Sequence, residues 1–153
     1  MGFSQDAANA NSTVVWKQGA LTVLINNALR SAINDVGQIV GTLNVPATAG
    51  TPFLWQNGTT TQLPTLPGMA PAGTALASND RGQIVGSLSN VAVLWHDGAV
   101  VDLNSQVATT DPLQPYVRLQ AATQINNLGQ IVASGSDSRG PPPGHWYILT
   151  PVK

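Results

Sequence analysis

The chain has 153 residues, of which 42% are apolar and only 8% are Asp, Glu, Lys or Arg. Its formal net charge of −1 provides no basic surface for nucleic acid, and no stretch approaches the ~18 apolar residues of a membrane-spanning helix. The chain contains no Cys, which excludes disulfides, thiolate metal ligands and Cys nucleophiles.

The first twelve residues, MGFSQDAANANS, are polar and predict a disordered N-terminal tail. They contain no apolar segment of the kind found in a signal peptide. The polar, uncharged composition favours a secreted, periplasmic or cell-surface bacterial protein whose signal peptide has been removed. A cytoplasmic protein is the alternative.

Four short apolar segments then follow one another as a unit. They read SAIN, GQIVGTL, TPFLWQ and TTTQLPTL and occupy residues 31–66. The same order recurs over residues 75–104 and, without its last segment, over 121–152. Two segments in residues 13–24 match the third and fourth. A period of roughly forty residues containing four short segments predicts four-stranded antiparallel units within a single all-β domain, residues 13–153.

Each unit contains the same short turn sequence. A type I turn prefers Asn or Asp at its first position and Gly at its fourth, where the backbone often reaches positive φ. The predicted structural turns are therefore Asn34 with Gly37, Asn79 with Gly82, and Asn126 with Gly129. A second hairpin is predicted after three of the Trp residues, as WKQG, WQNG and WHDG. In the last two, Gly58 and Gly98 complete the dipeptides preferred by type I′ turns.

The four tryptophans are interpreted as one repeated position at the end of the third segment. They are Trp16, Trp55, Trp95 and Trp146. We expect them to lie in the core of the repeats. The alternative is that their faces stack on sugar rings beside polar hairpins.

Segments of the form A-I-N-D-x-G-Q-I-V-G followed by F-L-W-x-x-G resemble the repeats of the HAF family of extracellular bacterial proteins. Here they read SAINDVGQIVG with TPFLWQNG, ALASNDRGQIVG with AVLWHDG, and ATQINNLGQIVA with HWYILT. The third copy departs from the pattern, because Ala133 replaces the closing Gly. The resemblance implies export and a propeller-like or related repeat architecture, and it implies no catalytic residues.

The predicted fold is all-β, with about thirteen short antiparallel strands in roughly three four-stranded repeats around a pseudo-threefold axis. A β-prism or a small propeller-like array is favoured, and a β-trefoil is the alternative. Because bare sheet edges invite aggregation, we expect a closed ring in which residues 21–24 lie beside residues 146–150.

No catalytic or metal motif is present, and no cofactor is expected. His96 and His145 are the only histidines, and each is expected in a turn or loop. Asp35, Asp80 and Asn127 occupy equivalent turn positions, and calcium binding is the alternative interpretation of their side chains. Turn chemistry explains them without an ion, since no copy has the carboxylate spacing of an EF-hand loop.

Two loops interrupt the periodicity, at residues 104–118 and 136–145. Function often lies in such loops, so the candidate ligand-binding residues come from them and from the next residue. They are Tyr116, Arg118, Arg139, His145 and Trp146. The run Pro141–Pro143 favours polyproline II and is expected to be a stiff connector, with docking in a groove as the alternative.

The predicted function is that of a non-catalytic binding or structural module of the bacterial exterior, with a glycan or a host or cell-surface protein as ligand. The alternative is a hydrolase with an unrecognised site between sheets. We expect a monomer that binds no nucleic acid and does not span a membrane.

Overall fold

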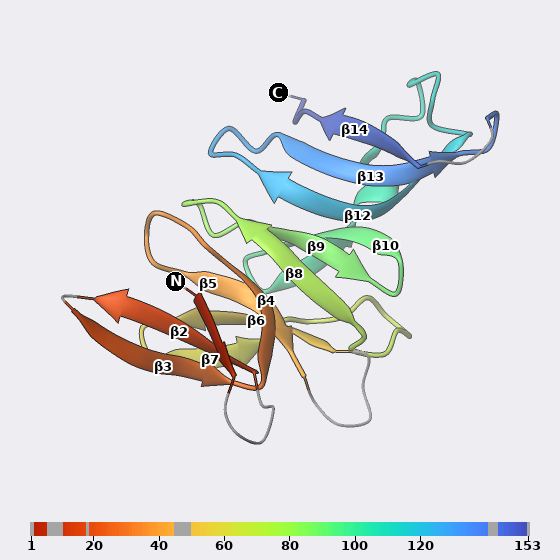
Figure 1. The fold of residues 1–153 in the computed structure, drawn as a ribbon. Coiled ribbons are helices and arrows are strands. Elements are labelled where there is room, and N and C mark those ends of the chain that lie inside the picture. Colours follow the sequence, from red (N-terminus) through yellow and green to blue (C-terminus); the bar gives the residue numbers. More distant parts are fainter. Residues whose placement is uncertain (1, 6–10, 18, 45–49, 141–143, 153) are drawn as a thin grey trace.

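Strands dominate the fold, as expected from a sequence rich in Val, Thr, Gly and Asn. The computed structural model describes all residues except 1, 6–10, 18, 45–49, 141–143 and 153. Four antiparallel sheets follow one another along the described chain, and none of them is closed (Figure 1).

The strands of each sheet are joined in the order of the sequence. The N-terminal sheet contains β1 (Gly2–Gln5), β2 (Asn11–Lys17) and β3 (Ala20–Asn26). The second sheet contains β4 (Ala28–Ile33), β5 (Ile39–Leu43), β6 (Thr51–Gln56) and β7 (Thr59–Gln62). The third sheet contains β8 (Gly73–Ser78), β9 (Ile84–Leu88), β10 (Val91–His96) and β11 (Ala99–Asp102). A 3-10 helix, η1 (Leu103–Gln106), leads to the C-terminal sheet of β12 (Val117–Ile125), β13 (Ile131–Asp137) and β14 (His145–Leu149).

The all-β antiparallel prediction is confirmed, but the strands are grouped differently. The described residues form four sheets of three, four, four and three strands. One strand was not expected, because β1 forms where the sequence predicted a disordered tail. It pairs with β2, with Gly2 opposite Val14. An edge strand is held by backbone hydrogen bonds, which do not require apolar side chains.

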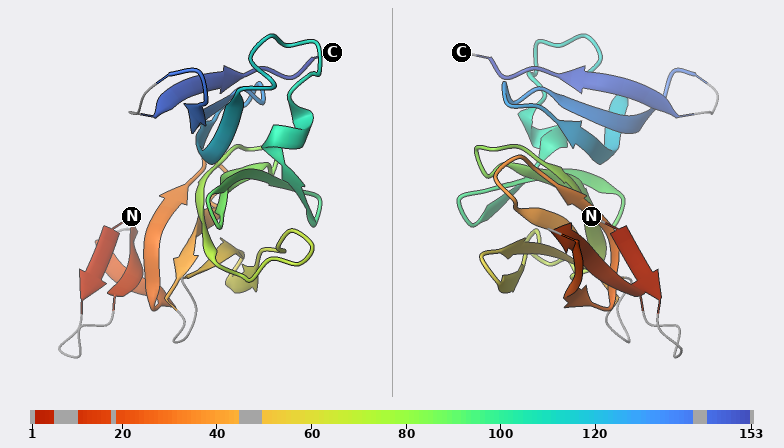
Figure 2. Two further views of the ribbon diagram at one scale, coloured as in Figure 1. Left: turned by 90° about the vertical axis from the view of Figure 1, so that its right-hand side faces the viewer. Right: turned by 60° about the vertical axis from the view of Figure 1, so that its left-hand side comes forward.

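The expected ring closure is wrong. In the described chain β3 pairs with β2, β14 pairs with β13, and the two end sheets lie at opposite ends of the molecule (Figures 1 and 2). The first strand of a sheet packs on the preceding sheet instead: β8 contacts β4, β5 and β6, and β12 contacts β8, β9 and β10. Each sheet packs on the far side of the sheet before it, so the N-terminal and C-terminal sheets do not meet.

The apolar core lies between successive sheets. Phe53 and Ile39 pack with Ile25 and Val15 between the N-terminal and second sheets. A larger cluster that includes Trp95 joins the second and third sheets, and another joins the third and C-terminal sheets. The central strands of the two middle sheets are therefore covered on both faces, which explains an unbroken apolar run such as that of β10.

The repeated turns have the geometry that their sequence predicts. The backbone N–H of the glycine donates to the carbonyl of the asparagine at 3.1, 3.2 and 3.0 Å. The turns are Asn34–Gly37, Asn79–Gly82 and Asn126–Gly129. The three glycines have φ values of +80°, +75° and +81°, where glycine carries no steric penalty.

The glutamine after each glycine completes the turn, a role that the sequence pattern did not reveal. In each copy the asparagine Nδ2 donates to the glutamine Oε1, at 2.7, 2.7 and 2.8 Å. The asparagine Oδ1 accepts from the glutamine backbone N–H. The pairs are Asn34 with Gln38, Asn79 with Gln83, and Asn126 with Gln130.

The same asparagines also join one sheet to the next. Asn34 Nδ2 donates to the carbonyl oxygen of Asn79 at 2.9 Å. Asn79 Nδ2 in turn donates to the carbonyl oxygen of Asn126 at 3.0 Å. Both bonds connect turns in different sheets. The repeated Asn-x-x-Gly turn therefore joins neighbouring sheets and also reverses the direction of the chain.

A parallel set of bonds runs through the next residue of each turn. The backbone N–H of Asp35 donates to Asp80 Oδ1 at 3.1 Å, and the N–H of Asp80 donates to Asn127 Oδ1 at 2.9 Å. Asn127 Nδ2 also donates to Asp80 Oδ2 at 2.6 Å. The side chains of Asp80 and Asn127 thus accept bonds from a neighbouring turn, which gives them a structural role that needs no ion.

Gly82→Val is expected to lower the free energy of unfolding by about 1–3 kcal/mol, because a β-branched residue is strained at positive φ. Apart from its chain neighbours, no atom lies within 4 Å of a Cβ built at Gly82, whose φ is +75°, so the loss reports backbone strain rather than a clash. Arg81→Ala, whose exposed side chain leaves the turn backbone unchanged, should cost less than about 0.5 kcal/mol. Equilibrium urea unfolding measures both, and equal losses would contradict the turn geometry.

The core interpretation of the tryptophans is wrong for two of the four. Trp95 is 2% exposed, and its Nε1 donates to the Pro64 carbonyl at 2.7 Å, while Trp55 is half-buried. Trp16 and Trp146 are 73% and 67% exposed. Both belong to end sheets, which in the described part of the chain have a neighbouring sheet on one side only.

Trp146 also does not occupy the repeated tryptophan position. In the second and third sheets, Trp55 pairs with Ile39 and Trp95 pairs with Ile84. In the C-terminal sheet, the residue that pairs with the equivalent Ile131 is Leu149. Strand pairing, rather than residue identity, therefore sets the equivalence.

Candidate functional site

Three of the candidate ligand-binding residues meet at the end of the C-terminal sheet where β12 begins and β13 ends. Tyr116 immediately precedes β12, and Arg139 follows the end of β13. The backbone N–H of Ser138 donates to the Tyr116 carbonyl at 3.0 Å and holds the two segments together. His145 begins β14 on the same edge. We call Tyr116, Asp137, Arg139, His145 and Tyr147 the loop-end cluster.

Arg139 links the cluster. Its Cζ lies 4.7 Å from the centre of the Tyr116 ring, within the range of a cation–π contact. Its Nη2 and Nε donate to the Asp137 carboxylate at 2.7 and 3.0 Å. These bonds lower the pKa of Asp137 to about 2 and raise the pKa of Arg139. Both side chains are therefore charged at neutral pH.

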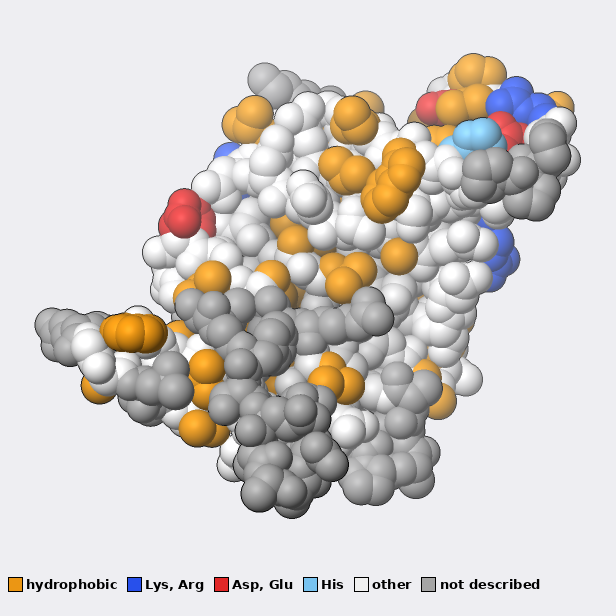
Figure 3. All heavy atoms as spheres, in the orientation of Figure 1, with side chains coloured by type: hydrophobic (Ala, Val, Ile, Leu, Met, Phe, Trp, Pro, Cys, Tyr) orange, Lys and Arg blue, Asp and Glu red, His pale blue; other side chains and the backbone are white. Residues whose placement is uncertain are grey.

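His145 and Tyr147 complete the cluster from β14. Their ring centres are 6.3 Å apart, as expected for residues on one face of a strand. The Tyr147 hydroxyl is buried without a hydrogen-bond partner among the described residues, and its burial raises the pKa of Tyr147. Figure 3 shows basic, acidic and histidine side chains together at this end of the molecule. The cluster thus combines donors, acceptors and aromatic rings in a small area.

Two candidate residues do not join the cluster. Trp146 lies between His145 and Tyr147 on β14, so its side chain points to the opposite face of the sheet. Arg118 is exposed on β12 opposite Ser136, and within the described chain it makes no hydrogen bond or ion pair with the cluster. Pro141–Pro143 lie outside the described residues.

Sequence reasoning missed Asp137 and Tyr147. The spacing in Asp-Ser-Arg over residues 137–139 was a usable signal, because a carboxylate two residues before an arginine can accept from its side chain within one turn. The Asp137 carboxylate also accepts from the Arg139 backbone N–H at 2.9 Å. Tyr147 carried no comparable signal, because its burial depends on a neighbouring segment.

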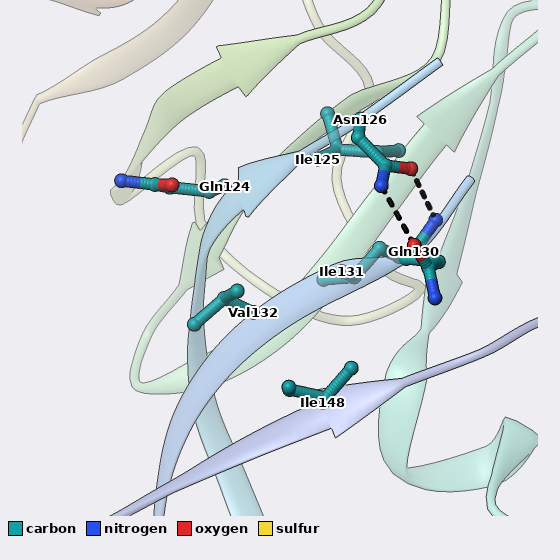
Figure 4. A pocket seen from close by; sticks show the side chains of 7 residues that line it. All are labelled: Gln124, Ile125, Asn126, Gln130, Ile131, Val132 and Ile148. Carbon is teal, nitrogen blue, oxygen red and sulfur yellow. Dashed lines mark hydrogen bonds between the residues drawn. The ribbon is translucent and has the colours of Figure 1, made fainter. Parts of the chain in front are cut away.

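The outer face of the C-terminal sheet carries a shallow depression of about 310 Å³. Figure 4 shows Gln124, Val132 and Ile148 along it, with Asn126 and Gln130 joined by two hydrogen bonds at one end. The side chains that line it are apolar or uncharged, so it offers no acid or base.

A second groove, of about 600 Å³, lies where the second and third sheets meet. Thr42 donates a hydrogen bond to Thr74 at this site, and Ser87, Ser89 and Asn90 also line it. None of the described lining residues is ionisable. The groove presents hydroxyl and amide groups that can bind a polar ligand, without a group that could transfer a proton near neutral pH.

His96 lies apart from these surfaces. It is exposed at the hairpin between β10 and β11, where its Nε2 is 3.5 Å from the carboxylate of the adjacent Asp97. Within the described chain, no three His, Asp or Glu side chains lie close enough to hold a metal ion together.

Comparisons with protein-family models, curated proteins and solved structures found no match to this chain. In the part of the chain that the structure describes, no helix has the length and apolar character needed to cross a membrane.

Proposed function

We propose that this chain is a non-catalytic binding or structural module of the bacterial exterior, with a glycan or a cell-surface protein as its ligand. The loop-end cluster carries this proposal. It holds a carboxylate, a guanidinium, an imidazole and aromatic rings together on an exposed edge, and such groups bind hydroxyl-rich or peptide surfaces. The sequence resemblance to the HAF repeats supports export.

The geometry of the cluster defines how a ligand would be held. Asp137 uses its carboxylate to orient Arg139, and Arg139 covers one face of Tyr116. His145 remains exposed beside them. A ligand would therefore bind through hydrogen bonds to the exposed guanidinium and imidazole, rather than by stacking on the covered face of Tyr116.

We further propose that the four sheets form an open, propeller-like array, in preference to a prism or a trefoil. In support, β8 and β12 each pack across the face of the sheet before them, and equivalent turns are hydrogen-bonded to one another along one side. Such an array offers loops at both ends of each sheet for binding, an argument from fold analogy alone.

A hydrolase remains the alternative function, with the groove between the second and third sheets as its site. The hydroxyl and amide lining of the described part of this groove favours polar binding over proton transfer. This observation supports the non-catalytic proposal.

A labelled sample of the full chain on a glycan array, together with a screen of cell-surface proteins, tests the proposal. We expect Arg139→Ala to reduce binding at least about tenfold, as is common when a charged hydrogen-bonding anchor is removed. Arg81→Ala is the matched control, because it removes the same charge from an exposed turn outside the cluster. Turnover in a parallel screen of hydrolase substrates, or binding that Arg139→Ala leaves unchanged, would contradict the proposal.

A further inference from the structure

The outer face of the C-terminal sheet is built like a surface that another sheet covers. Strand pairing makes Val132 and Ile148 equivalent to Val85 and Leu94 of the third sheet. In the third sheet both residues pack against the C-terminal sheet, and Val85 is fully buried. No described segment covers the equivalent positions in the C-terminal sheet, where Ile148 is 74% exposed.

The Asn126 turn, at the same face, likewise has no partner in a further sheet of the described chain. Asn34 and Asn79 each donate from Nδ2 to the carbonyl of the following turn. Asn126 makes the local bonds of its own turn, but in the described chain it has no following turn to bond. The C-terminal sheet thus presents both the apolar residues and the hydrogen-bond donor that the preceding sheets use at their interfaces.

The N-terminal sheet exposes the complementary half of such an interface. Trp16 is equivalent to Trp95, because each stands at the same place before a hairpin and pairs across it, with Leu21 and Val100 respectively. Trp95 points back toward the preceding sheet and packs in the cluster that contains Val40 and Leu54 of that sheet. Trp16 is exposed because no described sheet precedes its own.

The contact of Trp95 with the second sheet shows which residues of the C-terminal sheet Trp16 would meet. Val40 and Leu54, which pack with Trp95, are equivalent by strand pairing to Val132 and Ile148 on the outer face of the C-terminal sheet. The residues that line the depression there are uncharged, so charge repulsion does not oppose docking. Figure 3 shows apolar side chains exposed over both end sheets. Contiguous patches of exposed apolar side chains mark interaction surfaces.

We propose that two copies of this chain associate head to tail, with the outer face of the C-terminal sheet of one copy on the free face of the N-terminal sheet of the next. Trp16 of the second copy then covers Val132 and Ile148 of the first, as Trp95 covers Val40 and Leu54 within one chain. Because the interface joins two different surfaces, it continues from copy to copy and produces oligomers larger than dimers. This differs from the monomer expected from the sequence, and it does not depend on the proposed ligand site.

Sedimentation velocity of the full chain over a concentration series tests the proposal. We expect the mean mass of the wild-type protein to rise with concentration past roughly twice the monomer mass, because the interface does not close on itself. Ile148→Lys and Trp16→Lys should each remain monomeric. Leu113→Lys is the matched control, since it places the same charge on an exposed apolar residue of the 104–118 loop and should leave association unchanged.

An equimolar mixture of the two blocked variants distinguishes head-to-tail docking from other modes. Trp16→Lys keeps an intact C-terminal sheet, and Ile148→Lys keeps an intact N-terminal sheet, so the mixture should form one-to-one dimers and nothing larger. Circular dichroism of each variant verifies its folding, with Ile148→Ser as a milder substitute if a variant does not fold. Wild-type protein that stays monomeric, a mixture that stays monomeric, or association blocked by Ile148→Lys alone would overturn the proposal.

Discussion

Gly86→Ala is expected to lower the free energy of unfolding by roughly 3 kcal/mol or more, because a new methyl group would meet backbone that cannot move aside cheaply. A Cβ built at Gly86 lies 2.0 Å from the carbonyl oxygen of Thr74 and 3.0 Å from Cα of Ala75, both on the neighbouring strand β8. The third sheet is packed on both faces, so β8 cannot shift without disturbing two interfaces. Equilibrium urea unfolding and the melting temperature both measure the loss.

Gly82→Ala is the control for this substitution. Gly82 has positive φ, and the space that a Cβ would enter there is open, with no atom beyond its chain neighbours within 4 Å. Alanine at this position should therefore cost only about 1–2 kcal/mol of backbone strain. Equal losses at both positions would show that β8 and β9 separate easily.

In the C-terminal sheet, the position equivalent to Gly86 is occupied by alanine. Ala133 pairs with Tyr147 as Gly86 pairs with Val93, and Ala133 is fully buried. The ladder between β12 and β13 has two bulges, whereas the ladder between β8 and β9 has one. The departure from the repeat sequence at Ala133 thus coincides with a different strand pairing.

Asn79→Ala is expected to cost about 3 kcal/mol, because it removes several hydrogen bonds from a buried site. Asn79 is 3% exposed. Its side chain donates to Gln83 and to the carbonyl of Asn126, and accepts from the backbone of Arg81 and Gln83. Urea unfolding of the full chain measures the change.

Asn126→Ala separates the contribution of the turn from that of the bond between sheets. Asn126 makes the same bonds within its turn but is exposed, and its side chain reaches no following turn in the described chain. We expect a loss of about 1 kcal/mol. If Asn126→Ala and Asn79→Ala destabilise the protein equally, the bond from Asn79 to the next sheet adds no stability.

Local chemistry explains which parts of the fold were predictable. The turns at Asn34, Asn79 and Asn126 depend on residues within four positions of each other, so their geometry follows from the sequence. The type I′ hairpins likewise follow from Asn57-Gly58 and Asp97-Gly98, all four of which have positive φ. Short hairpins pair neighbouring strands, and the all-β antiparallel class follows from that.

The candidate site was predictable only in part. Tyr116, Arg139 and His145 were selected because they lie in or next to the loops that interrupt the periodicity, and the structure brings them together. Asp137 and Tyr147 were missed because their roles depend on the pairing of β13 with β14 and on burial. Trp146 was assigned to the wrong position because sequence spacing cannot reveal which residue lies opposite Ile131.

The amino-acid sequence is enough to predict the turns, the short strands and their antiparallel pairing, because these depend on backbone conformations that a few adjacent residues select. It is not enough to predict the order in which sheets pack, the exposure of Trp16 and Ile148, or the bonds from one asparagine turn to the next, which arise only in the folded chain. These depend on contacts between residues far apart in the chain. Equivalent apolar side chains are buried in a middle sheet and exposed in an end sheet, and the surrounding sequence does not distinguish the two environments.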